Sequence, residues 1–66
     1  MQVLVNDEIM DVEAAISIQQ LIDKLGYKKE SIAVAVNQTF VPRSAYETTV
    51  VHEKDTIEFV APMAGG

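Results

Sequence analysis

The stretch SIQQLIDKLG, residues 17–26, predicts the one clear helix of this chain and thereby decides the class of fold. Its apolar residues are spaced i, i+3, i+4, i+7, which places them on one helical face: Ile18, Leu21, Ile22 and Leu25. Ser17 is a suitable N-cap and Gly26 a suitable left-handed stop, so the helix is expected to span Ile18–Leu25. A helix with one apolar face requires a second layer of structure to cover it.

Strand patterns flank this helix on both sides. Met1, Val3 and Val5 recur at every second position, which is typical of a half-buried strand closed by the turn-forming residues 6–8. A second strand over Ile9–Val12 would complete a hairpin. After the helix we expect a strand over Ile32–Val36, with a short continuation at residues 40–41 before Pro42. A tight turn or a single helical turn over 43–46 follows, and then strands over Thr48–Val51 and Thr56–Val60 around a turn at 53–55.

This order of elements predicts an α+β fold, in which a mixed sheet of four to five strands is covered on one face by one main helix. A β-grasp, the ubiquitin-like arrangement, fits it best. The ferredoxin-like alternative needs two packing helices, and the second half of the chain has no other apolar pattern of 3.6-residue period long enough to supply one. We expect a single domain over residues 1–66, with residues 62–66 as a flexible C-terminal tail.

Composition excludes several classes of function. Ten acidic and five basic residues give a formal net charge of -5, which removes most of the electrostatic basis for binding nucleic acid and favours a protein partner with a basic docking surface. The absence of cysteine excludes disulfides, thiolate nucleophiles and cysteine-type zinc sites. The sequence has neither a signal peptide nor an apolar run near the roughly 20 residues of a membrane span, so we expect a cytoplasmic protein that does not bind membranes.

The search for a side-chain active site finds little. His52 is the only histidine, and one imidazole supplies neither a metal-ligand set nor a catalytic triad, so it is interpreted as an exposed turn residue. The acidic residues near positions 7–8 and 53–55 are interpreted in the same way. We therefore expect a protein that is not itself an enzyme and binds no metal or cofactor.

The C-terminal residues Gly65-Gly66 are the most informative feature for function. Glycine has no Cβ, so an extended glycine pair fits a narrow channel and leaves the Gly66 carboxylate open to attack. A carboxylate becomes a good electrophile only after activation, for example as a mixed anhydride with AMP, from which a sulfur nucleophile displaces AMP to leave a thiocarboxylate. The chain has no phosphate-binding loop, so ATP would be used by a partner enzyme. Two alternatives give the Gly-Gly ending no function: the residues are a frayed tail, or the sequence is a truncated gene product.

The sequence resembles the ThiS-type sulfur carriers of thiamin thiazole synthesis, a family of short ubiquitin-like proteins ending in Gly-Gly. The matching elements span nearly the whole chain: the opening strand with Asn6, the helix Ile18–Leu25, the run 35–37, residues 41–43 with Tyr46, residues 55–58, and Gly65-Gly66. The resemblance implies that an E1-like adenylyltransferase activates Gly66, that a persulfide donor protein supplies sulfur, and that thiazole synthase receives it. Lys54 departs from the family pattern, which usually has glycine before the aspartate.

Further residues are candidates for contact with a partner. If Val3 and Val5 face the helix, the strand alternation turns Leu4 outward, and the last strand turns Val60 outward in the same way. These two residues would join Ala33 and Ala35 in an apolar patch on the open face of the sheet. The remaining candidates are Met63, in the tail, and Arg43. We interpret Arg43 mainly as a structural residue that anchors the turn beside Pro42 to a carboxylate. Asn37 is likewise interpreted as structural, because asparagine suits a turn.

Three alternatives remain open from the sequence. The related carrier subunit of molybdopterin synthase uses the same chemistry with a different acceptor. A ubiquitin-like modifier would end with Gly66 in an isopeptide bond to lysine. A passive binding module would carry the Gly-Gly tail without using it.

Overall fold

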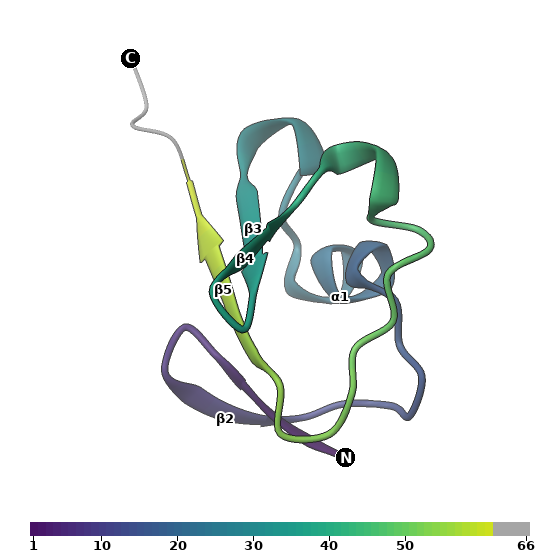
Figure 1. Cartoon of the computed structure of the whole chain (residues 1–66), viewed down its shortest axis with the longest axis vertical. Coiled ribbons are helices and arrows are strands. Elements are labelled where there is room, and N and C mark those ends of the chain that lie inside the picture. Colours follow the sequence, from purple (N-terminus) through teal and green to yellow (C-terminus); the bar gives the residue numbers. More distant parts are fainter. Residues whose placement is uncertain (62–66) are drawn as a thin grey trace.

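The computed structural model describes residues 1–61 and forms one sheet with one α-helix packed against it (Figure 1). The elements in chain order are β1 (Gln2–Val5), β2 (Glu8–Asp11), α1 (Ile18–Leu25), η1 (Lys29–Ser31), β3 (Ala33–Val36), β4 (Thr39–Val41), η2 (Arg43–Ala45) and β5 (Thr56–Val60), where η denotes a 3-10 helix. The sheet order is β2-β1-β5-β3-β4. The expected mixed sheet with one covering helix, a β-grasp, is confirmed.

Two hairpins form the outer parts of the sheet, and both have two-residue turns. Asn6 and Asp7 join β1 to β2 with φ angles of 49° and 69°, and Asn37 and Gln38 join β3 to β4 with 50° and 71°. Positive φ at both central residues matches the right-handed twist of the flanking strands. Asparagine tolerates this conformation better than most residues, which explains its place at the start of each turn.

The centre of the sheet is a parallel pair formed by the first and last strands. Leu4 pairs with Thr56 and Val5 with Ile57. On its other side β5 pairs antiparallel with β3, so that Ala33 lies opposite Val60. The end of β5 therefore meets the beginning of β3 at one end of the sheet.

Local signals define α1 as the sequence predicts. Ser17 and Gln20 form a reciprocal capping box, in which the Gln20 backbone N–H donates to Ser17 Oγ at 3.1 Å and the Ser17 N–H donates to Gln20 Oε1 at 2.9 Å. Gly26 ends the helix in the left-handed conformation, with a φ of 81°. The predicted bounds Ile18–Leu25 are confirmed.

The core lies between α1 and the sheet. Val3, Val5, Ile57 and Phe59 are all buried, as the strand alternation predicts. They pack with buried residues of α1, β3 and the loops: Val12, Ile16, Ile18, Leu21, Ile22, Ile32, Val34, Tyr46 and Val51. The opposite face of the sheet has no helix over it within residues 1–61 (Figure 1).

The predicted strand over Thr48–Val51 is wrong. This segment forms only a single bridge, between Val50 and Ser17. The Thr49 N–H donates to the Ala45 carbonyl at 2.9 Å, which continues the turn of η2, and the Val51 N–H donates to the Ile16 carbonyl at 2.8 Å. The backbone of this segment thus joins the segment before α1 instead of a neighbouring strand of the sheet.

Candidate functional site

The C-terminal segment carries the predicted chemistry, and its root is the end of β5. Met63, Gly65 and Gly66 lie outside the described residues, as does the whole predicted tail over residues 62–66. The last described residue, Ala61, directly follows β5. What the structure defines is therefore the point from which the C-terminal segment starts.

This root is held by a contact with the β1–β2 turn. The Phe59 backbone N–H donates to Asn6 Oδ1 at 2.9 Å, and the Asn6 N–H donates to the Ile57 carbonyl at 3.0 Å. On the helix side, the Phe59 ring lies 5.3 Å from the ring of Tyr27, measured between centroids. β5 is thus fixed at its last residues from both layers of the fold, and the C-terminal segment begins at a well-supported position.

The other end of β5 is fastened by side chains that the sequence places in turns. Asn37 Oδ1 accepts the Thr56 N–H at 2.9 Å, and Asn37 Nδ2 donates to Asp55 Oδ1 at 3.0 Å. Asp55 Oδ2 accepts the His52 backbone N–H at 2.8 Å. The structural interpretation of Asn37 is confirmed.

His52 has the exposed position that the sequence predicts. Its side chain is 79% exposed, and its Nδ1 lies 3.8 Å from Asp55 Oδ2. The described residues hold no group of three or more histidine, cysteine, aspartate or glutamate side chains placed to bind a metal ion.

The open face of the sheet carries most of the predicted contact residues, with one correction. Val60 is 55% exposed, and Leu4 and Ala33 are half-buried on the same face. Ala35 is only 7% exposed, because it lies between Phe40 on β4 and Glu58 on β5, the residues opposite it in register. Ala35 therefore forms the floor of this face and presents little surface to a partner.

Sequence reasoning missed the two most exposed apolar residues of this face. Ile9 is 72% exposed beside Leu4, and Phe40 is 71% exposed beside Ala35. Both are determined by hairpin register: a two-residue turn at Asn6-Asp7 places Ile9 opposite Leu4, and the turn after Val36 places Phe40 opposite Ala35. We define the open-face patch as Leu4, Ile9, Ala33, Phe40 and Val60.

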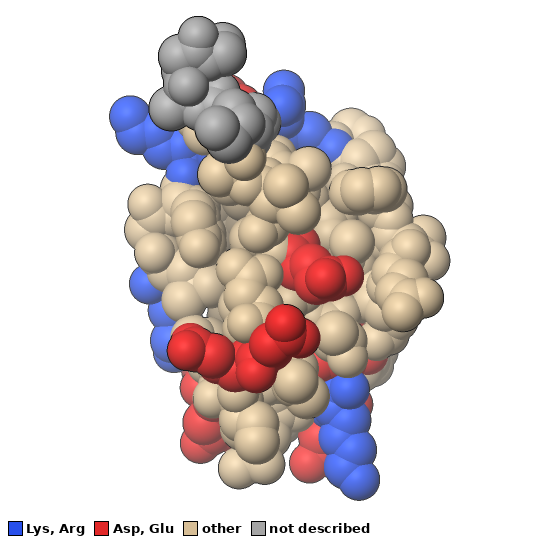
Figure 2. All heavy atoms as spheres, turned by 90° about the vertical axis from the view of Figure 1, so that its left-hand side faces the viewer, with Lys and Arg blue, Asp and Glu red and all other residues tan. Residues whose placement is uncertain are grey.

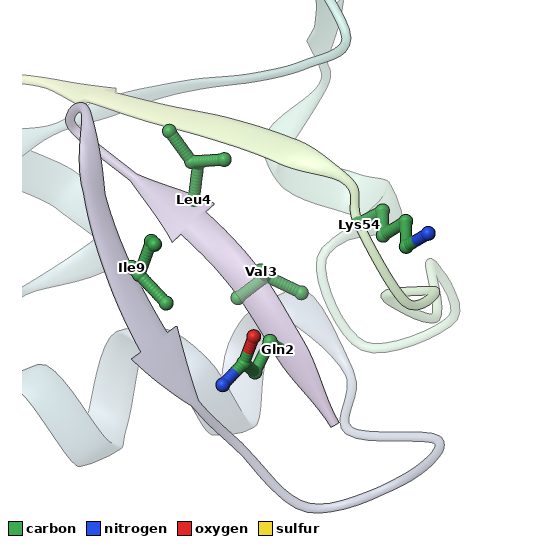
Figure 3. Close-up of a pocket in the computed structure, with 5 residues that line it drawn as sticks. All are labelled: Gln2, Val3, Leu4, Ile9 and Lys54. Carbon is green, nitrogen blue, oxygen red and sulfur yellow. The ribbon is translucent and has the colours of Figure 1, made fainter.

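A shallow hollow of about 260 Å³ adjoins this patch at the beginning of β1 (Figure 3). Gln2, Val3 and Leu4 line it from β1, Ile9 from β2 and Lys54 from the loop before β5. Its walls are mostly apolar, and Lys54 is its only ionisable side chain. Such a surface fits an apolar contact.

Arg43 begins η2 and is exposed. The predicted anchoring to a carboxylate does not occur within residues 1–61, where its side chain forms no ion pair. The single helical turn after Pro42 is confirmed, and the backbone makes it, through the Ala45 N–H donating to the Pro42 carbonyl at 2.9 Å. The side chain of Arg43 is not needed for the turn.

Comparison with known proteins agrees with this geometry. Residues 2–66 match the sequence model of the ThiS family. The chain belongs to the ThiS family. It is 33% identical over 66 residues to the sulfur carrier protein ThiS of Escherichia coli (strain K12), with both chains covered in full.

Solved structures and longer relatives extend the comparison of this ThiS-family chain. The crystal structure of the thiamine biosynthesis protein ThiS from Geobacter metallireducens has a TM-score of 0.87 at 28% identity, with both chains covered completely. Two thiazole synthases also contain a similar segment, from Paramagnetospirillum magneticum at 32% identity and from Magnetococcus marinus at 35%. The chain matches along its whole length but spans only 20% of each synthase.

Proposed function

We propose that this protein is a sulfur carrier in the synthesis of the thiamin thiazole and that its working group is the carboxylate of Gly66. The observation that carries the proposal is the end-to-end match with the Escherichia coli sulfur carrier protein ThiS. The Gly65-Gly66 sequence and the firmly held root at the end of β5 add physical support, because a fixed root narrows the volume that the carboxylate must search.

In the proposed reaction, the Gly66 carboxylate attacks the α-phosphorus of ATP bound to an E1-like adenylyltransferase, and pyrophosphate leaves. The outer sulfur of a persulfide on a donor protein then attacks the acyl carbon, and AMP leaves. A thiol cleaves the resulting S–S bond by exchange, which leaves a thiocarboxylate on Gly66. The carrier supplies the acyl group and its position, and the partners supply the nucleotide and the sulfur.

Thiazole synthase is the proposed acceptor of this sulfur. The similar segments in the two thiazole synthases support this choice, because joining a carrier domain and its acceptor in one chain raises their effective concentration. The ThiS family match likewise favours the thiamin pathway over the molybdopterin pathway. We propose a cytoplasmic location, where ATP and persulfide donors are present. Within residues 1–61 no helix is long and apolar enough to cross a membrane.

The open-face patch is the proposed contact surface for these partners. Two of its residues adjoin the root of the C-terminal segment, since Val60 is the last residue of β5 and Ala33 lies opposite it. A partner that covers the patch would therefore hold Gly66 within reach of its own active site. Exposed apolar residues that gather on one face of a small protein are typical of interaction sites.

Intact mass spectrometry of the chain purified from its source tests the proposal. Exchange of one oxygen for sulfur at Gly66 is the expected result, and an alkylating reagent should then add one alkyl group to that sulfur. Attachment to lysines of other proteins through Gly66 would instead identify a modifier. A mass that stays unchanged in cells actively making thiamin would refute the carrier function.

A further inference from the structure

The charges of this acidic protein are unevenly distributed. Lys28 and Lys29 with the adjacent Glu30, taken together with Arg43, carry a net charge of +2. The other residues include two basic side chains, Lys24 and Lys54, and nine acidic ones, a net of -7, which together with +2 gives the total of -5. A protein with this division presents surfaces of opposite sign to its partners.

The topology places the three cations at the end of the sheet where β5 ends. β3 is antiparallel to both β4 and β5, so its first residue, Ala33, lies at the same end as the last residues of those two strands. η1, with Lys29, leads directly into β3, and Arg43 follows β4 after Pro42. Figure 2 shows Lys and Arg side chains on two sides of this upper end, and Asp and Glu side chains over the centre and lower part of the face, with further Lys or Arg side chains at its left flank and lower right.

Contacts in the fold hold these segments near the root of the C-terminal segment. Tyr27, which precedes Lys28, packs its ring against Phe59 near the end of β5. Arg43 follows β4, the edge strand beside β3, so the segments that carry Lys29 and Arg43 join strands on the same side of β5. The exposed side chain of Val60 lies at the end of β5, opposite Ala33 at the beginning of β3.

The fold itself makes little use of these charges. Lys28, Lys29 and Arg43 are exposed, and none of them forms an ion pair with any residue of 1–61. Five residues follow Ala61, and an extended segment of that length reaches at most about 17 Å. Any protein that receives Gly66 must therefore bring its own surface close to the three cations.

We propose that Lys28, Lys29 and Arg43 form a cationic docking surface for an acidic rim on the protein that receives Gly66. The inference rests on the proposed function and adds the charge of the partner, which is opposite to the basic surface that the net charge alone suggests. With negative charge over the rest of the molecule, an acidic rim attracts the tail end and repels the other surfaces. Encounter is then both faster and correctly oriented.

The experiment uses the full chain and the adenylyltransferase of the same organism, with association rates measured by stopped flow at low and moderate salt. The variants are Lys29→Glu and Arg43→Glu, with Lys54→Glu as the matched control. All three change the net charge by the same amount, but Lys54 precedes β5 and so lies at the opposite end of the sheet. We expect each of the first two to slow association at least about threefold at low salt, and the double variant about tenfold, with a weaker salt dependence. Lys54→Glu should have a smaller effect than either.

Equal effects of all three charge reversals, or faster association of Arg43→Glu, would overturn the proposal that the partner has an acidic rim. Circular dichroism of each variant separates loss of docking from loss of fold. Adenylation of the wild-type chain in the same mixtures tests the proposed function separately. Adenylation of the wild type with equal effects of the three reversals rejects the docking surface alone, whereas a wild type that neither binds nor is adenylated rejects both.

Discussion

Asn37 and Asp55, eighteen residues apart, are joined by a 3.0 Å hydrogen bond from the Asn37 amide nitrogen to Asp55 Oδ1. Asn37 also accepts the Thr56 N–H through its side chain and donates its own N–H to the Thr56 carbonyl at 2.7 Å. The β3–β4 turn is thereby fastened to the first residue of β5. Because β5 ends at the root of the C-terminal segment, this clamp helps to set the register on which the position of the root depends.

Removing the Asn37 side chain should destabilise the protein in two separable ways. Asn37→Ala loses both side-chain hydrogen bonds and also places a Cβ residue at a φ of 50° that asparagine tolerates better. We expect the free energy of unfolding to fall by about 1–3 kcal/mol. Asn37→Gly loses the same bonds but relieves the backbone, so it should be less destabilising than alanine. Urea unfolding measures both, and equal losses would contradict the strain component.

Lys54 offers the opposite test, because its backbone is strained and its side chain forms no hydrogen bond or ion pair within residues 1–61. It has a φ of 69°, and its N–H donates to the Gln2 carbonyl at 2.8 Å. Lys54→Gly keeps that backbone hydrogen bond and removes the steric cost of holding a residue with a Cβ in the left-handed conformation. The extra entropy of glycine in the unfolded chain offsets part of this gain in stability. A gain of about 0.5–1 kcal/mol is expected in urea unfolding. Lys54→Ala should give no gain, and a gain of the same size would attribute the effect to charge.

Sequence reasoning succeeded where the determining interactions are local. The ends of α1 follow from Ser17 and Gly26, and the buried faces of β1 and β5 follow from strict alternation. The segment Thr48–Val51 has the β-branched composition of a strand, yet its backbone hydrogen bonds go to Ala45 and Ile16. Such partners are chosen by tertiary packing, which strand propensity does not report.

The candidate site could be predicted only in part for the same reason. The outward directions of Leu4 and Val60 require a strand period alone. The burial of Ala35 depends on its cross-strand neighbours, and so do the positions of Ile9 and Phe40 beside the other patch residues. Neither hairpin turn contains the glycine of the strongest hairpin signals, so the register of both was hard to recognise. Met63, Gly65 and Gly66 remain predictions from the sequence.

The open-face patch is tested by Val60→Asp, which adds charge at an exposed position and should leave the fold intact. Binding to the adenylyltransferase should weaken by about tenfold or more, because a carboxylate would be desolvated in the interface. Val50→Asp is the matched control: Val50 is also exposed, but it lies beside Ser17 and outside the patch. Isothermal titration calorimetry measures both affinities, and similar losses for the two variants would remove the patch from the mechanism.

Leu4→Asp tests the same face at a half-buried position, where stability and binding are both affected. Leu4 lies beside Ile9 and Thr56, so the new carboxylate is only partly hydrated. We expect a loss of about 1–2 kcal/mol in unfolding free energy and a folded circular dichroism spectrum. Complete unfolding would mean that Leu4 contributes to the core.

The final prediction concerns Gly66, on which the proposed chemistry depends. Deletion of Gly66 withdraws the carboxylate by one residue, and Gly66→Val adds a branched side chain where the partner's channel is expected to be narrow. Either change should lower adenylation at least about 100-fold, because misplacement of a reacting group by a small distance is enough for such a loss. Pyrophosphate release in the presence of ATP and the partner enzyme measures the rate.

The unfolding midpoint should not change, since the core is formed by residues of α1, the sheet and the loops before Ala61. Ala61→Val, which adds a branched side chain at the exposed root, is the matched control and should retain most of the activity. Full adenylation of the Gly66 deletion would show that the acyl group lies elsewhere and would overturn the carrier mechanism.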